Sequence, residues 1–95
     1  MGLLAPLNPP IRRWDGQRVW IVGASSGIGA ALARALAGRG AWVALSARRR
    51  EALEEVAAAC GGEALVEPMD VTCPEDFERV RDRLLAAWGR LDLVV

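Results

Sequence analysis

The chain has 95 residues, 53% hydrophobic and 25% charged, which is typical of one small globular domain. Lysine plus arginine and aspartate plus glutamate number 12 each, so no net charge would attract nucleic acid or an anionic membrane surface. Two cysteines, Cys60 and Cys73, and the absence of histidine argue against a metal site and favour reduced thiols in a cytoplasmic protein.

The first 16 residues predict an extended arm ahead of the domain. They contain three prolines and no apolar run long enough for a signal peptide or a membrane span. We expect Ile11 and Trp14 to attach this arm to the domain, and Asp15 with Gly16 to form a turn before the first strand. The chain is therefore divided into an N-terminal extension, residues 1–16, and a domain, residues 17–95.

The domain begins with a strand and a helix that meet at a glycine-rich turn. Residues 19–22 are all apolar, which predicts a strand covered on both faces. Apolar residues then recur at helical spacing, at Ile28, Leu32, Ala35 and Leu36. Between these segments lies the sequence GASSGIG, residues 23–29. Such a turn directs free backbone N–H groups and the positive end of the helix dipole at one point, where a pyrophosphate fits.

The spacing of the glycines narrows the kind of nucleotide site. Gly23, Gly27 and Gly29 read G-x-x-x-G-x-G, which differs from G-x-G-x-x-G because Ser25 stands where that pattern has a glycine. A P-loop is excluded because no Gly-Lys pair is present. The alternative interpretation is a tight turn whose glycines serve backbone geometry alone.

Strands and helices continue to alternate along the rest of the chain. Further strands are predicted at residues 41–46, 64–70 and 91–95, and helices at residues 48–60 and 72–89. Gly38 and Gly40 are expected to end the first helix, and Pro68 indicates that the third strand ends irregularly or lies at the edge of the sheet. The last helix begins with a predicted capping box of Thr72 and Glu75. Its expected buried stripe comprises Phe77, Val80, Leu84 and Ala87.

This alternation predicts an α/β fold with a doubly wound parallel sheet in three layers. The expected strand order is 3-2-1-4, which puts the nucleotide at the carboxyl edge of the first strand. Because the last predicted strand, residues 91–95, reaches the end of the chain, we expect a sheet truncated after its fourth strand.

The turn sequence GASSGIG after an apolar strand resembles the short-chain dehydrogenase/reductase family, and the resemblance extends over residues 17–95. It implies a Rossmann-like fold that binds NAD(P). The implied pyrophosphate and ribose contacts come from Ser25, Ser26 and Ile28, with Gly23, Gly27 and Gly29 shaping the turn. Asp70 and Val71 correspond to the pair that meets the adenine edge. For Asp70 the alternative is an Asx turn leading into the next helix. Asp92 is interpreted as structural.

The implied cofactor preference depends on the end of the second strand. NAD-preferring members have an acidic residue there, and this chain has Ala47. Arg48 stands where NADP-preferring members have an arginine, although the run of residues 48–50 is also typical of a solvated helix face. Ser26 replaces a second basic residue found in many NADP-preferring members. The resemblance therefore favours NADP(H), with NAD(H) as a possible cofactor.

No catalytic residue is expected within the chain. The family's Asn-Ala-Gly motif and its catalytic Ser and Tyr-x-x-x-Lys would follow Val95, and the chain contains no tyrosine or lysine. The resemblance implies the cofactor-binding part of an oxidoreductase that interconverts a small-molecule carbonyl and an alcohol, homo-oligomeric when full length. The alternative is a non-catalytic nucleotide-binding or sensor module of the same fold. A methyltransferase fits less well, because its second strand usually ends in an acidic residue.

Overall fold

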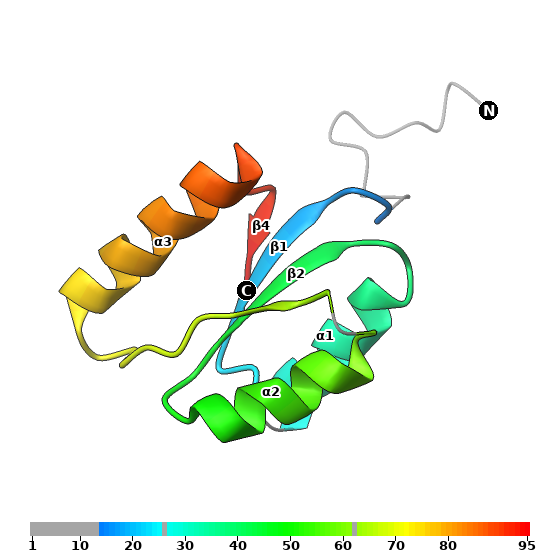
Figure 1. The fold of residues 1–95 in the computed structure, drawn as a ribbon, viewed down its shortest axis with the longest axis horizontal. Helices are drawn as coiled ribbons and strands as arrows, with labels where there is room; N and C mark the ends of the chain where they lie inside the picture. The colour runs from blue at the N-terminus through cyan, green and yellow to red at the C-terminus, as the bar shows by residue number, and fades with distance from the viewer. Residues whose placement is uncertain (1–13, 26, 62) are drawn as a thin grey trace, which may run out of the picture.

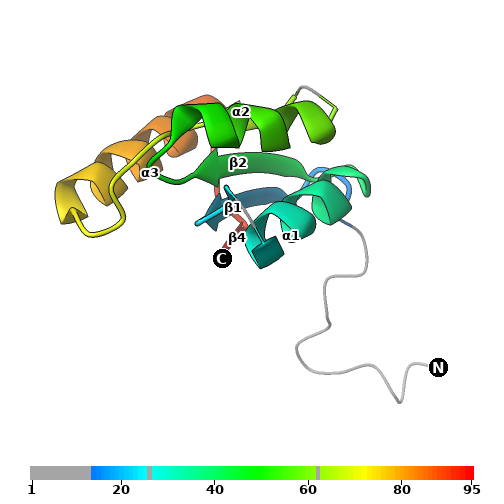
Figure 2. The same cartoon turned by 90° about the horizontal axis from the view of Figure 1, so that it is seen from below.

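The computed structural model describes residues 14–25, 27–61 and 63–95, which form a four-stranded parallel sheet with helices on both faces (Figure 1). The elements in chain order are β1 (Arg18–Val22), α1 (Gly27–Ala37), β2 (Trp42–Ser46), α2 (Arg50–Ala59), β3 (Leu65–Val66), α3 (Pro74–Trp88) and β4 (Leu93–Val94). The strand order is β3-β2-β1-β4, and the sequence β2, β1, β4 can be followed in Figure 2. The predicted α/β class and strand order are confirmed.

The sheet separates two apolar clusters, as a doubly wound fold requires. Alternate strand residues such as Val19, Ile21 and Leu45 face α1 and α2, while Trp20 and Ala44 face α3. In Figure 1 the helix α3 lies on one side of the strands, and α1 and α2 lie on the other. Both faces of the central strands are therefore buried, which explains why their sequences are apolar without alternation.

The extension is only partly within the described residues. The prediction for residues 1–13, including the anchoring role of Ile11, lies outside them. Trp14 is half-buried and packs against the cluster under α1 and α2, as expected. Gly16 adopts a φ of 78°, and the amide of Gln17 donates to the carbonyl of Trp14 at 3.0 Å, so the predicted turn before β1 is present.

The buried face of α1 agrees with the predicted one only in part. Leu36 is buried and Leu32 is half-buried against the core, as predicted. Ile28 is 89% exposed and Ala35 is also exposed, and Ala30 and Ala33 are buried in their place. The physical reason is the close approach of α1 to the turn before it. A helix that packs this closely turns its small residues toward the sheet and leaves bulky Ile28 outside.

The ends of the other elements also differ from the predicted ones. Helix α2 begins at Arg50 instead of residue 48. Helix α1 ends at Ala37, just before Gly38, and Gly40 has the left-handed φ of 90°, in agreement with the predicted glycine stop. Strand β3 has two residues rather than seven. Its ladder continues, because the amides of Glu67 and Met69 donate to the carbonyls of Leu45 and Ala47, both at 2.9 Å. Pro68 lies between them and faces the open edge of the sheet, so its missing amide leaves this ladder intact, and the predicted edge position is confirmed.

The predicted capping box of α3 is wrong. The residue before the helix is Cys73, which makes no side-chain cap, and the hydroxyl of Thr72 donates instead to Oδ1 of Asp70 at 2.6 Å. The Oδ2 of Asp76, in the first turn of α3, accepts from the backbone amide of Asp70 at 3.0 Å, three residues before the N-cap, so it joins the helix to the β3 extension. Of the predicted stripe, Val80 and Leu84 are fully buried, while Phe77 is 38% exposed. Ala87 is exposed as well.

Candidate functional site

The segments that carry the predicted cofactor residues meet at the carboxyl edge of the sheet. Strands β1 and β2 run parallel with Val22 paired to Ser46, so the chain leaves both strands at the same level. The glycine turn follows Val22, and Arg48 follows Ser46 by two residues. The extension of β3 ends at the same edge beside Ala47. In an open α/β sheet this edge is where ligands bind.

Each of the three glycines has a geometric reason to be there. Gly23 and Gly27 have φ angles of 81° and 60°, which side chains rarely adopt. A Cβ at Gly29 would lie 2.5 Å from the carbonyl oxygen of Gly23, so α1 can approach the turn only without a side chain there. These facts satisfy the backbone-geometry interpretation and also leave the start of α1 open to a ligand.

The N-terminus of α1 has the features of an anion site. The helix begins at Gly27 and has no acidic residue in its first turn, so nothing there opposes the positive end of its dipole. Ser25 is half-buried just before it, and Ile28 projects into solvent from its first turn. Ser26 lies outside the described residues.

Arg48 and Asp70, which are 22 residues apart in sequence, are brought together beside this turn. The Nη2 of Arg48 lies 3.4 Å from Oδ1 of Asp70, and the two side chains are 68% and 45% exposed. An ion pair this exposed contributes little to stability, so Arg48 can exchange its partner at low cost. Ala47, at the position where an acidic residue would favour NAD, is buried and neutral.

Asp70 forms the Asx turn that was the alternative interpretation for it. The amide and the hydroxyl of Thr72 donate to its Oδ1 at 2.9 and 2.6 Å. These two hydrogen bonds, with a smaller contribution from Arg48, lower the pKa of Asp70 below its usual value. The carboxylate therefore stays charged at neutral pH, and its second oxygen, Oδ2, takes no part in these contacts.

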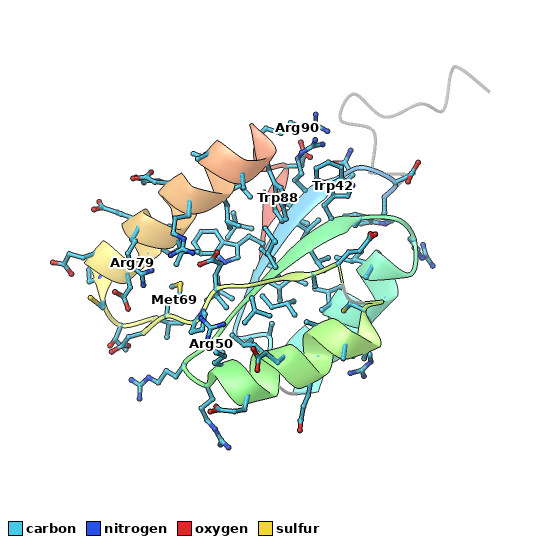
Figure 3. All side chains as sticks on the ribbon, viewed as in Figure 1. Trp42, Arg50, Met69, Arg79, Trp88 and Arg90 are labelled. Atoms are coloured by element: carbon cyan, nitrogen blue, oxygen red, sulfur yellow. The ribbon has the colours of Figure 1, made fainter. Side chains whose placement is uncertain are left out.

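An open hollow of about 430 Å³ is lined by Arg48, Pro68, Met69 and Asp70. Val71, next to it in sequence, is 53% exposed. A second hollow, of about 370 Å³, is lined by residues that include Asp15, Trp42 and Trp88, at the start of the strands. Figure 3 shows Trp42 and Trp88 at the end of the sheet away from Met69 and Arg50. Of these two hollows, the first is the one at the carboxyl edge of the sheet.

Ser46 occupies a central place at this edge, and the sequence assigns it no role. It is fully buried at the end of β2, and its carbonyl accepts from the amides of Gly23 and Ala24 at 2.7 and 3.2 Å. Its hydroxyl accepts from the indole Nε1 of Trp20 at 2.8 Å. The available signal was a single polar residue at the end of an otherwise apolar strand.

Comparison with known proteins identifies the family. A model of the short chain dehydrogenase family matches residues 17–95. The chain belongs to this family. An 11-beta-hydroxysteroid dehydrogenase A from Arachis hypogaea is 46% identical over 84 residues, which cover 84% of this chain and 24% of the relative.

Solved structures of short-chain dehydrogenases share the fold. L-sorbose reductase from Gluconobacter frateurii, complexed with NADPH and L-sorbose, has a TM-score of 0.78 and 33% identity over 84% of this chain and 32% of its own. NAD+-bound xylitol dehydrogenase has a TM-score of 0.82 and 32% identity over 87% and 33%. The chain thus spans about a quarter to a third of the length of these family members. Within the part that the structure describes, no helix is long and apolar enough to cross a membrane.

Proposed function

We propose that residues 17–95 are the cofactor-binding part of an NADP(H)-dependent oxidoreductase that interconverts a carbonyl and an alcohol. The observation that carries the proposal is the meeting of a glycine turn at the start of α1 with Arg48 and a neutral Ala47 at the end of β2. The NADPH complex of L-sorbose reductase and the NAD+ complex of xylitol dehydrogenase, both of similar fold, support a nicotinamide dinucleotide, and Ala47 and Arg48 carry the choice of NADP(H). We also propose that the full-length protein is cytoplasmic and homo-oligomeric.

The proposed contacts place the cofactor along the carboxyl edge. The pyrophosphate lies against the first-turn amides of α1, with Gly23, Gly27 and Gly29 giving it access. The hydroxyls of Ser25 and Ser26 hold the pyrophosphate and the adenosine ribose. Ile28 contributes its backbone amide. The nicotinamide, when bound, supplies the hydride, and the residues of this chain bind and orient it.

The adenosine end of the cofactor lies in the hollow between Arg48 and Asp70. A guanidinium binds a 2′-phosphate through two charge-assisted hydrogen bonds, which Arg48 makes after leaving its exposed pair with Asp70. Asp70 is then free to accept from the adenine amino group through its second oxygen, while the amide of Val71 meets the ring edge. A carboxylate at position 47 would instead repel the phosphate and accept from a ribose 2′-hydroxyl.

The test exchanges these two features in the full-length polypeptide. We expect NADPH to bind at least about tenfold tighter than NADH, because one charged hydrogen-bonded contact contributes roughly 1.5 to 3 kcal/mol. The double variant Ala47→Asp, Arg48→Ala should reverse that order. Arg50→Ala is the matched control, since Arg50 lies in α2 and pairs with Glu54 at 3.8 Å. Titration of NADPH and NADH against the parent, the double variant and the control measures the ratio of the two affinities in each protein. Equal affinities in the parent, or an unchanged ratio in the double variant, would remove Arg48 from the site.

A further inference from the structure

The indole of Trp20 reaches across the sheet to the end of the neighbouring strand. Trp20 pairs in register with Ala44, and Ser46 lies two residues further along β2 on the same face. The indole Nε1 donates to the hydroxyl oxygen of Ser46 at 2.8 Å, and both residues are 0% exposed. Water cannot replace a hydrogen bond in such a position, so removal of either partner leaves a buried polar group unpaired.

Ser46 connects this buried bond to the glycine turn. Its carbonyl oxygen accepts from two consecutive amides of that turn, Gly23 and Ala24. The next residues along the chain are Ala47 and Arg48. A rotation of Ser46 would therefore shift the start of the turn and the direction in which the chain leaves β2. Both segments belong to the proposed cofactor site.

Helix α3 holds the indole in the orientation that this bond needs. The ring of Phe77 lies against that of Trp20, with centroids 4.7 Å apart and planes inclined by 34°. Val80, Leu84 and Met69 complete the same buried cluster. Because the indole is enclosed by these side chains, its N–H has a fixed direction along the face of the sheet toward Ser46.

We propose that Trp20 is a positioning residue for the cofactor: through its hydrogen bond to Ser46 it fixes the glycine turn that receives the pyrophosphate. The residue itself does not touch the cofactor. Its effect on cofactor affinity rests on the proposed function, whereas its effect on the turn is a property of the fold. The two can be measured separately.

The first measurement is amide hydrogen exchange in the full-length polypeptide without cofactor. Trp20→Phe keeps an aromatic ring against Phe77 but removes part of the buried indole together with the donor, so Ser46→Ala, which removes the acceptor with little change of volume, is measured beside it. We expect the amides of Gly23 and Ala24 to exchange about 3- to 10-fold faster, in keeping with the loss of one buried hydrogen bond. The amide of Trp42, bonded to the carbonyl of Gln17 at 2.8 Å at the other end of the same strand pair, is the internal reference. General destabilisation would accelerate all three amides alike, and that outcome would overturn the inference.

The second measurement is the titration of NADPH and NADH against folded protein. Trp20→Phe and Ser46→Ala should each weaken both cofactors about 3- to 10-fold, and the double variant should be no weaker than the single ones, because all three lack the same bond. Trp42→Phe, which changes a 47% exposed tryptophan at the far end of β2, should leave both affinities unchanged. Ser46→Ala removes the acceptor of the hydrogen bond from Trp20. This variant tests the proposal if the Trp20 variant does not fold.

The outcomes separate the two proposals. Faster turn exchange with weaker cofactor binding supports both. Faster turn exchange in a parent that binds neither cofactor refutes the proposed function and supports the role of Trp20 in holding the turn. Unchanged affinities in a Trp20→Phe variant of a cofactor-binding parent overturn the positioning role, whatever the variant does to the melting temperature.

Discussion

At the scale of single residues, the candidate site depends on how closely two backbone segments approach each other. The carbonyl of Gly23 lies where a side chain at Gly29 would have to begin. The same approach turns Ala30 and Ala33 into the sheet. Gly29 therefore sets both the packing of α1 and the access of a ligand to its N-terminus.

We predict that Gly29→Ala impairs stability and cofactor binding together. Its Cβ would lie 2.5 Å from a backbone oxygen that cannot move without displacing β1, which should cost roughly 1 to 3 kcal/mol of unfolding free energy. NADPH affinity should fall more than about tenfold. Denaturant unfolding and cofactor titration of the full-length polypeptide measure both effects.

Gly38→Ala is the control for this substitution. Its nearest atom, the carbonyl oxygen of Arg34, would be 3.3 Å from the new Cβ, and the position lies at the far end of α1. The expected change in stability is below about 1 kcal/mol, with no change in cofactor affinity. Equal losses for the two variants would show that the close approach at Gly29 has no special importance.

At the scale of elements, side chains with polar groups join the ends of neighbouring segments. Asp92 ties β4 to β1: the amide of Arg18 donates to its Oδ2 at 2.8 Å, and Nε of Arg90 donates to Oδ1 at 3.0 Å. The hydrogen bond from Arg18, followed by the charge and hydrogen bond of Arg90, lowers the pKa of Asp92 below its usual value. This carboxylate is structural, in agreement with its interpretation from the sequence.

We predict that acid weakens the pairing of β4 with β1. The lowered pKa means that the unfolded chain takes up the proton more readily than the folded one. The stabilisation is therefore fully present above the ordinary pKa of about 4 and is lost as the pH falls through the lower folded value. Unfolding free energies of the full-length polypeptide between pH 6 and pH 3 should fall less steeply for Asp92→Asn than for the parent. A slope for Asp92→Asn equal to that of the parent would show that this carboxylate does not cause the loss of stability in acid.

A second prediction at this scale concerns the start of α3. Asp76→Ala should lower the unfolding free energy by roughly 0.5 to 2 kcal/mol, because its Oδ2 accepts from the backbone amide of Asp70 at the end of the β3 extension. Glu75→Ala, which removes an exposed contact with the thiol of Cys73, should cost less. Thermal unfolding of the two variants compares their losses of stability. A larger loss for Glu75→Ala than for Asp76→Ala would contradict this prediction and favour the capping role predicted for Glu75.

The sequence predicts the elements of this fold better than the contacts between them. Apolar runs and helical spacing identify the strands and helices that the structure describes, because the spacing of apolar residues reflects which faces of an element are buried. The sequence leaves two interpretations of Asp70 open, an adenine contact and an Asx turn, because the bond of Thr72 to Asp70 depends on how the chain leaves β3. Ile28 was assigned to the wrong face because local spacing does not record how closely Gly29 lets the helix approach. Ser46 was overlooked because its partner, Trp20, is 26 residues away.

At the scale of the whole molecule, the described residues leave apolar groups at one edge of the sheet. β4 is the strand next to β1 at that edge, and Val94 and Val95 are 46% and 50% exposed beside it. An exposed apolar edge strand offers backbone and side chains to a second chain. A domain of this size has little stability to offset such an exposure.

We therefore predict that the 95-residue chain, produced by itself, associates through this edge. Val95→Lys should reduce the association, because a charge on an edge strand opposes pairing with another copy while its backbone bonds to Val22 and Trp20 remain. Ala58→Lys makes the same change in charge on the exposed face of α2 and should leave association as it is in the parent. Light scattering on gel filtration at several concentrations compares the three proteins. A monodisperse parent monomer with a cooperative thermal transition, or equal relief by both lysines, would show that the β4 edge does not cause the association.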